Sequence, residues 1–381
     1  MSTAESPEYL VSEAQLELTE ARRQKAERTK DIGEPIQLAG KALALQVYKG
    51  YGWLAENTTV ARKMDLETGK TLQIYKGHTG PATSLAFYEK ESKDYLLTGS
   101  WDKTIKVWDT TTKAMVSSTD AHSDFVKCLC VVQSLHLLIS GSSDKIVRFW
   151  DLSKVEADTP LTSLGSISSH TRPIACIEGV ALSASTGLLY TADTMGIIRI
   201  WDLVKEGNTE PRWKATLKTE LQHHRTGITD LQLSGDRLWT ASTDETAQLT
   251  VGSKTACSIT HPLAVRCLVS LSELDEPYII TGSGDVIRVY DVSDLDKPEL
   301  LNEIDAHWHD VTVLQLWARA TGGEPWLIST SLDGTIRKWR VADLLKPRPP
   351  VPPPEVKSTK AELEFSMTED EERELAELMD D

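Results

Sequence analysis

A short unit of two apolar runs around a turn recurs along this chain and limits the folds open to it. In Leu96–Asp109 (LLTGSWDKTIKVWD) an apolar run ends at a turn of small residues, and the alternating run Thr104–Trp108 follows. Alternation with a period of two is typical of β-strands, so the segment predicts a strand, a tight hairpin and a second strand. Related segments are Leu138–Asp151, Leu189–Asp202, Tyr278–Asp291, Leu327–Arg340 and, more loosely, Leu238–Val251. Six related copies in one chain predict a repeat architecture.

Three residue types recur with this unit, the first before it and the other two within it. A histidine precedes each copy, at His78, His122, His170, His224, His261 and His307. A serine or threonine lies four residues before the aspartate position of the hairpin, in the pairs Thr98/Asp102, Ser140/Asp144, Thr191/Met195, Thr240/Asp244, Thr281/Asp285 and Ser329/Asp333. An aromatic residue follows at Trp108, Trp150, Trp201, Tyr290 and Trp339. Several offsets that recur together make the pattern specific.

Some copies depart from this pattern. Met195 replaces the aspartate beside His170, Thr250 replaces the tryptophan of its copy, and the hairpin at Asp285–Tyr290 is one residue shorter than the others. Lys41 stands where later repeats carry a histidine, so residues 41–76 form a divergent first repeat. We expect less rigidity at these places. We attribute these departures to sequence drift, which a repeat protein tolerates. The alternative is that a departure marks a residue that faces a ligand.

The pairs Gly77–His78 and Trp108–Asp109 resemble those of the WD-repeat family, and the resemblance extends over residues 34–341. It implies an all-β fold, a β-propeller of four-stranded blades arranged radially. The six clear copies and the divergent first one then predict seven blades. Because the last repeat lacks a fourth strand, we expect Pro35–Gly40 to supply the outer strand of the last blade. That pairing closes the ring and removes an exposed sheet edge.

Extensions flank the propeller, which we place at residues 34–345. Residues 1–33 predict a charged helical extension over residues 8–31, which is either solvated or binds a partner. Residues 346–381 combine the proline-rich linker Lys346–Pro354 with an acidic helix over Glu369–Met379, opened by a capping-box pattern at Thr368–Glu371. The linker is a spacer or a ligand for an aromatic groove. The acidic helix is either solvated or a recognition helix for a basic, partly apolar groove.

Histidine, hydroxyl and aspartate recur together, which suggests a hydrolase triad. For His78, Thr98, Asp102 and Trp108, the resemblance implies instead that the histidine contacts the aspartate, the hydroxyl and the indole N–H. Each buried polar group then has a partner, as burial requires. The corresponding groups are His122, Ser140, Asp144, Trp150 and His307, Ser329, Asp333, Trp339. Since an enzyme does not need one site per repeat, we expect a structural role and no enzyme.

We expect no metal and no cofactor. His223–His224 and His307–Trp308–His309 lack a nearby thiolate or carboxylate pair. No glycine-rich loop follows a strand and opens a helix. The five cysteines are odd in number and lie in apolar stretches, so they predict reduced core residues: Cys128, Cys130, Cys176, Cys257 and Cys267.

The distribution of charged and apolar residues limits the kinds of partner that the chain can bind. The net charge is −16, and residues 361–381 alone hold ten acidic residues and one basic residue. An acidic tail on a nearly neutral body argues against direct binding of nucleic acid. No apolar run approaches the roughly 20 residues that a membrane span needs. The N-terminus lacks a basic and then apolar signal segment, so we expect an intracellular protein, cytoplasmic or nuclear.

Large side chains in the loops around the histidines and hairpin aspartates predict a surface for protein or peptide partners on the narrow face of the propeller. Tryptophan and arginine are typical anchors of such surfaces. The alternative for each residue is that it only covers its loop. The set is Trp101, Phe125, Arg172, Arg225, Trp308, His309 and Asp310.

We therefore expect a non-enzymatic scaffold that mediates protein–protein interactions within an intracellular multiprotein complex. One alternative is a nuclear assembly factor or chaperone for basic clients in ribosome biogenesis or chromatin. Another is a substrate adaptor of a ubiquitin ligase. Some adaptor propellers carry a Trp-Asp-x-Arg motif, whereas the segments Trp108–Thr111, Trp150–Ser153 and Trp201–Val204 end without arginine, which argues against that class.

Overall fold

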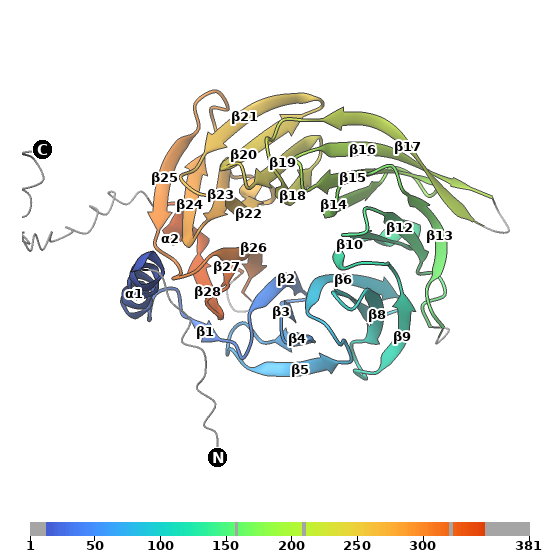
Figure 1. Cartoon of the computed structure of the whole chain (residues 1–381), viewed down its shortest axis with the longest axis horizontal. Coiled ribbons are helices and arrows are strands. Elements are labelled where there is room, and N and C mark those ends of the chain that lie inside the picture. Colours follow the sequence, from blue (N-terminus) through green and yellow to red (C-terminus); the bar gives the residue numbers. More distant parts are fainter. Residues whose placement is uncertain (1–12, 157–158, 208–210, 320–322, 347–381) are drawn as a thin grey trace, which may run out of the picture. The chain divides into compact units, whose positions relative to one another are not determined.

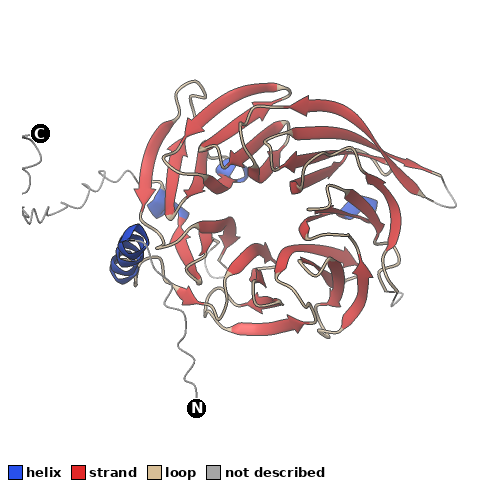
Figure 2. Cartoon of the chain, in the orientation of Figure 1, coloured by secondary structure: helices blue, strands red, loops and turns tan. Residues whose placement is uncertain are grey.

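The computed structural model describes residues 13–156, 159–207, 211–319 and 323–346. These residues form seven four-stranded antiparallel sheets arranged as blades around a central axis (Figures 1 and 2). Blades 1 to 3 are β2 Ala42–Tyr48, β3 Tyr51–Glu56, β4 Val60–Met64, β5 Thr71–Lys76; β6 Ala82–Lys90, β7 Lys93–Ser100, β8 Thr104–Asp109, β9 Met115–Asp120; and β10 Val126–Val132, β11 Leu137–Ser142, β12 Val147–Asp151, β13 Thr162–Ile167. The expected seven-bladed propeller is confirmed.

Blades 4 to 7 continue the same order. They are β14 Ile174–Ala181, β15 Thr186–Asp193, β16 Ile198–Glu206, β17 Arg212–Leu221; β18 Ile228–Ser234, β19 Arg237–Ser242, β20 Thr246–Val251, β21 Lys254–Thr260; β22 Val265–Ser270, β23 Tyr278–Ser283, β24 Val286–Asp291, β25 Glu299–Ile304; and β26 Val311–Ala318, β27 Pro325–Ser331, β28 Thr335–Arg340 with β1 Ile36–Gln37.

The apolar core lies between the blades. One cluster combines Leu137, Ile139 and Phe149 of blade 3 with Ile174 and Leu189 of blade 4, all fully buried. An isolated four-stranded sheet would leave these side chains in water, so each blade depends on its neighbours. The whole ring is therefore required to bury the core.

Strand β1 closes the ring as expected. Ile36 lies opposite Ile336 and Gln37 opposite Thr335 in an antiparallel pair, so β1 is the outer strand of blade 7. The Leu38 amide adds a hydrogen bond to the Gly334 carbonyl at 2.9 Å. Leu38 itself is buried between blades 7 and 1.

Helix α1, Glu13–Arg28, ends in contact with blades 6 and 7, and Figure 1 shows it beside β25 and β28. The buried Arg337 guanidinium on β28 donates 2.5 Å hydrogen bonds to the carbonyls of Thr29 and Ile32, just past the helix end. The Thr29 carbonyl also accepts a hydrogen bond from the Ile32 amide at 3.2 Å, so the guanidinium holds the turn that follows the helix. Gly33 then adopts φ +74°, and a β-carbon there would lie 2.8 Å from the Trp339 ring, so glycine is required.

The remaining elements are short. They are the 3-10 turns η1 Gln133–Leu135 and η2 Leu271–Leu274 and the helix α2 Val341–Leu344. The expected helix over residues 8–31 is present over Glu13–Arg28, and its first residues lie outside the described part of the chain. So do the proline-rich linker and the acidic helix expected over residues 346–381, except Lys346. No helix in the described ranges is long and apolar enough to cross a membrane.

Closure by β1 predicts unequal effects at two adjacent residues. Leu38→Asp places a carboxylate in the blade 7–blade 1 core, which costs several kcal/mol and lowers the urea midpoint of unfolding strongly. Ala39→Asp is the control, because Ala39 is exposed. The measurement is tryptophan fluorescence against urea concentration. Equal midpoints for the two variants would show that the seam does not hold the ring together.

Candidate functional site

The expected polar group of blade 2 is assembled in the structure. His78 Nδ1 lies 2.8 Å from Asp102 Oδ2, and His78 Nε2 lies 2.7 Å from Thr98 Oγ1. The Trp108 indole N–H donates to the same hydroxyl at 2.9 Å. The histidine thus ties the loop before the blade to the β7–β8 hairpin and to the core of the sheet.

Blades 3 and 7 repeat this tetrad with serine as the hydroxyl. His122 contacts Asp144 at 3.0 Å and Ser140 at 2.8 Å. His307 contacts Asp333 at 2.8 Å and Ser329 at 2.9 Å. The indoles that complete these tetrads, each donating to its serine, belong to Trp150 at 2.8 Å and Trp339 at 2.9 Å.

The tetrad hydroxyls have no access to a substrate. Thr98, Ser140 and Ser329 are fully buried, and each already contacts a histidine and an indole N–H. A nucleophile must reach the reacting atom, which burial on all sides prevents. The arrangement holds loops and does not present a reactive group.

Burial and hydrogen bonding shift the tetrad pKa values in opposite ways. Burial lowers the pKa of His122 and His307, which favours the neutral imidazole. Burial alone would raise the pKa of Asp102, but hydrogen bonds from His78, Thr104 and the Thr79 amide outweigh it and leave that pKa below its usual value. The pKa values of Asp144 and Asp333 are also lowered despite their burial, so the pairs of blades 3 and 7 combine a neutral histidine with an ionised aspartate.

Blades 1 and 4, which lack the full tetrad, carry a buried ion pair instead. Arg62 binds both carboxylate oxygens of the buried Glu56, at 2.5 and 3.2 Å. In blade 4, Arg199 lies 3.6 Å from the buried Asp193 and donates to His170 Nδ1 at 2.8 Å. Each pair joins an acidic residue to an arginine six positions later. That spacing was visible in the sequence, and we missed it.

In blade 6 the short hairpin redirects its aspartate. His261 keeps its contact with Thr281 at 2.8 Å, but its Nδ1 has no hydrogen-bond partner among the described residues. Asp285 instead pairs with Lys25 of α1 at 2.8 Å, and Lys25 also contacts Asp305. The departure from the repeat pattern thus anchors the N-terminal helix.

The narrow face, on which these histidines and hairpins lie, carries an exposed aromatic pair. Trp101 and Phe125 come from neighbouring blades, and their rings stack with centroids 4.9 Å apart and planes 17° apart. They are 41% and 37% exposed, respectively. The Lys127 ammonium lies 5.8 Å from the Trp101 ring centre. Sequence reasoning placed both aromatics on this face but not in contact.

The other expected face residues divide into two groups. Arg172 and Arg225 are exposed, and the Arg225 guanidinium donates a long hydrogen bond to the Asp244 carbonyl at 3.4 Å. Trp308, His309 and Asp310 are half-buried. Burial lowers the pKa of His309, and the nearby Arg22 of α1 lowers it further, so this part of the face lies beside the helix.

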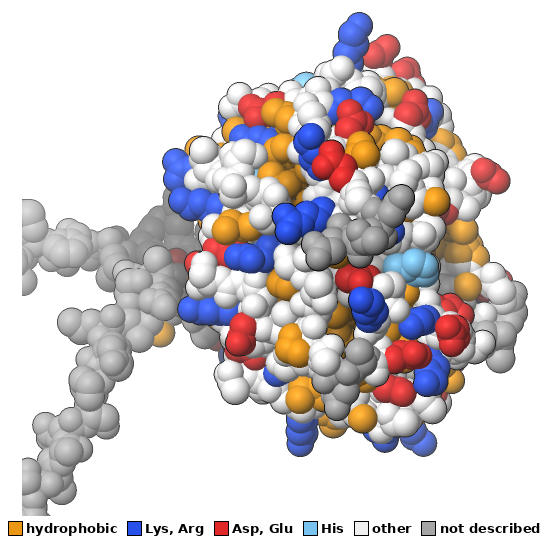
Figure 3. Space-filling view, turned by 90° about the vertical axis from the view of Figure 1, so that its right-hand side faces the viewer, with side chains coloured by type: hydrophobic (Ala, Val, Ile, Leu, Met, Phe, Trp, Pro, Cys, Tyr) orange, Lys and Arg blue, Asp and Glu red, His pale blue; other side chains and the backbone are white. Residues whose placement is uncertain are grey.

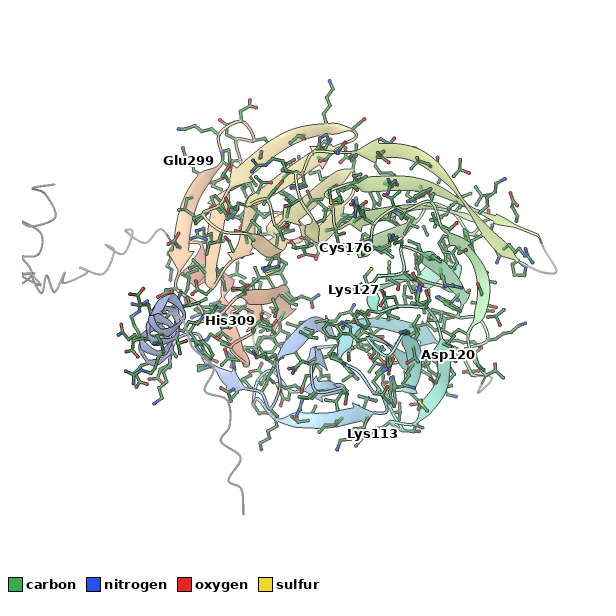
Figure 4. All side chains as sticks on the ribbon, viewed as in Figure 1. Lys113, Asp120, Lys127, Cys176, Glu299 and His309 are labelled. Atoms are coloured by element: carbon green, nitrogen blue, oxygen red, sulfur yellow. The ribbon has the colours of Figure 1, made fainter. Side chains whose placement is uncertain are left out.

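A cavity of about 540 Å³ opens among the loops of the narrow face. Three basic side chains line it, Lys127, Arg225 and Arg266, together with Met195 and several threonines. Sequence reasoning missed Lys127 and Arg266. Each lies five residues after a repeat histidine, His122 and His261, so a fixed offset could have found them. Figure 4 places Lys127 at the inner edge of the ring.

A second cavity, of about 520 Å³, is lined by inner strands and is acidic. Burial raises the pKa of Glu178 to about 7 and that of Asp230 to about 6. Asp230 is held by the amides of Leu231 and Leu268, both at 2.9 Å. Among the described residues, no group of three histidine, cysteine or acidic side chains could hold a metal ion.

Comparisons with known proteins agree with this architecture. The family model "WD domain, G-beta repeat" matches residues 69–109 and 114–151. An uncharacterized WD repeat-containing protein of Schizosaccharomyces pombe is 29% identical over 345 residues, which cover 86% of this chain and 84% of the relative. The matched repeats, this relative and the seven-bladed ring together support a WD-repeat β-propeller family for this chain. WD-repeat propellers generally bind other proteins and are typically non-catalytic scaffolds.

Two further matches are more distant. The U3 small nucleolar RNA-associated protein 15 homolog of Xenopus tropicalis is 24% identical over 253 residues, which cover 65% of this WD-repeat chain and less than half, 45%, of that relative. Among solved structures, the computationally designed Ika8 protein has a TM-score of 0.58 at 23% identity, over 78% of this chain and 83% of that one. The last match shows the fold alone.

The buried pair of blade 1 predicts a strong and asymmetric mutational response. Glu56→Ala leaves Arg62 largely buried without its partner and should cost about 3 kcal/mol of unfolding free energy. Glu56→Ala/Arg62→Met removes both charges and should recover part of that loss. Urea unfolding measures both effects. The control is Glu299→Ala, on the outer strand β25, whose ion pair with Lys297 is mostly exposed.

The buried histidines predict acid sensitivity. Burial lowers the pKa of His170 and of His261 to about 4, whereas an unfolded histidine titrates near pH 6.5. Below pH 6.5 the unfolded chain binds protons at these histidines that the folded chain does not bind. The contribution of the two histidines to the free energy of unfolding is therefore complete above pH 6.5 and is lost as the pH falls toward 4. Each histidine contributes on the order of 3 kcal/mol to that fall. The urea midpoint should therefore drop between pH 7.5 and pH 4.5, and less steeply for His261→Asn.

Proposed function

We propose that this protein is a scaffold that holds other proteins within an intracellular multiprotein complex, with the narrow face of its propeller as the main contact surface. The observation that carries the proposal is the exposed Trp101–Phe125 stack. Two aromatic rings left in water favour burial against a partner. The aromatic pair lies between two blades, so the rigid ring holds it in place.

The structure supports a contact surface rather than a reactive centre. In the tetrads of blades 2, 3 and 7 the hydroxyls are buried and already contact a histidine and an indole N–H. The outer rim offers a poor alternative, since Figure 3 shows basic and acidic side chains both spread over the part of the rim that faces the viewer. The narrow face instead carries the exposed aromatic pair, and Lys127, which lies 5.8 Å from the Trp101 ring centre, is one of three cations that line the cavity on this face.

A second candidate is a role in a nuclear assembly complex. It is favoured by the similarity to a protein named for its association with U3 small nucleolar RNA. The acidic residues 361–381 would suit basic clients. If this candidate is right, the intact protein should co-purify with nucleolar proteins, and deletion of residues 361–381 should reduce that recovery. The role of ubiquitin-ligase adaptor stays a prediction for which the Trp-Asp-x-Arg motif is missing.

The scaffold proposal predicts that partners depend on the aromatic pair. In affinity purification of the full chain from its own cells, Trp101→Ala/Phe125→Ala should reduce the recovery of specific partners at least about tenfold. The control is Tyr51→Ala. Tyr51 is an aromatic residue that is 38% exposed, and it lies in the β2–β3 hairpin at the end of blade 1 that is away from the narrow face. Circular dichroism checks that each variant is folded. Unchanged partners in the double variant would exclude this surface.

A further inference from the structure

Every inner strand carries a β-bulge at the same place near the narrow face. The pairing register shifts there in all seven blades, across Leu43, Thr83, Lys127, Ala175, Thr229, Arg266 and Thr312. A bulge leaves one residue out of the ladder and re-aims its side chain. The seven bulges thus form a ring of side chains around the central opening.

In three blades the bulge residue is a threonine that helps to hold the ring together. The hydroxyls of Thr83, Thr229 and Thr312 each donate to a carbonyl of the next blade, at 2.6, 2.7 and 3.1 Å. A threonine at this position therefore stabilises the contact between neighbouring blades. Uncharged apolar residues occupy the position in two other blades, leucine in blade 1 and alanine in blade 4.

Blades 3 and 6 place a cation at this position instead. Lys127 and Arg266 are both exposed, and neither makes the bridge to the next blade that threonine makes. The contact of Lys127 with Trp101 is a distant cation–π contact at 5.8 Å. Arg266 reaches Asp310 at 3.5 Å, with both side chains partly exposed, and such surface pairs contribute little to stability. The two cations are thus not explained by the fold.

Arg225 adds a third cation to the same opening. It comes from the loop after His224, and its amide, not its guanidinium, binds the Asp244 carboxylate at 2.8 Å. All three cations line the cavity of about 540 Å³ together with Met195, which is 46% exposed. The net charge of the chain is −16, so this cluster of cations has the opposite sign to the protein as a whole. Exposed apolar side chains lie beside it.

We propose that this opening, which we call the basic mouth (Lys127, Arg225, Arg266), binds an acidic segment of a partner protein. Carboxylates of the segment pair with the three cations, and a flanking apolar side chain packs on Met195 or on the Trp101–Phe125 stack. Opposite charges at a recessed surface attract the segment and fix its register. The proposal rests on the scaffold function and names the chemistry of its partner.

The fold itself supplies the matched substitutions. Lys127→Thr and Arg266→Thr install the residue that the same bulge carries in three other blades, so both variants should fold with a normal urea midpoint. Lys76→Thr is the control for the loss of a cation, since Lys76 is an exposed residue of the outer strand β5. Arg225→Gln removes the third charge.

The probe is a fluorescein-labelled twelve-residue peptide of glutamates interspersed with leucines, with glutamine-for-glutamate and lysine-for-glutamate versions. Fluorescence anisotropy on the full chain should show saturable binding of the acidic peptide only, weakened by raising the salt concentration. Lys127→Thr/Arg266→Thr should raise Kd at least about tenfold and flatten the salt dependence, whereas Lys76→Thr leaves both unchanged.

Three outcomes would overturn the proposal. They are equal affinity for the glutamine peptide, an unchanged Kd in the double threonine variant, and tighter binding of a single-stranded oligonucleotide of the same charge. The scaffold function is tested separately by the partners lost from Trp101→Ala/Phe125→Ala. If those partners are lost but the acidic peptide does not bind, the scaffold function stands and the proposed binding of an acidic segment at the basic mouth is wrong.

Discussion

Burial of both faces of each sheet against its neighbours is the constraint on which the rest of this structure depends. A blade such as β10–β13 has apolar side chains that only the next blade covers, as Phe149 and Ile174 show. No subset of blades satisfies this requirement, so the chain must return to its start. The short strand β1 meets that need with two paired residues and the buried Leu38. Ring closure is thus a consequence of core burial rather than an addition to it.

Polar contacts then fix the loops that the ring carries. The tetrads of blades 2, 3 and 7 and the ion pairs of blades 1 and 4 solve the same problem with different groups, because each gives buried polar atoms their partners. Our expectation that the divergent blades are less rigid at this network neglected this replacement. Glu56 and Asp193 stand in for the missing groups, and each pairs with an arginine on the following strand.

The blade count, the tetrads and the closing strand could be predicted from the sequence because they depend on the order in which residue types recur. The offset of ten residues from Thr98 to Trp108 recurs in later repeats, a histidine precedes each of them at a variable distance, and the missing fourth strand of the last repeat indicated Pro35–Gly40. The anchoring of α1 was not accessible in this way. Lys25 meets Asp285, and Arg337 meets the carbonyls of Thr29 and Ile32, only because ring closure brings blades 6 and 7 beside the N-terminus. The Trp101–Phe125 stack likewise joins two repeats, and no local pattern encodes the distance between them.

The bulge positions show how one backbone feature serves both stability and recognition. The extra residue in each inner strand lies outside the ladder, and the bulge gives its side chain a direction of its own. Threonine uses that direction to bind the next blade, and leucine or alanine leaves the position uncharged. Replacement by lysine or arginine costs the fold one bridging hydrogen bond but does not disturb the ladder. Each blade can therefore place a different charge at the opening, and here blades 3 and 6 place a cation there in a protein of net charge −16.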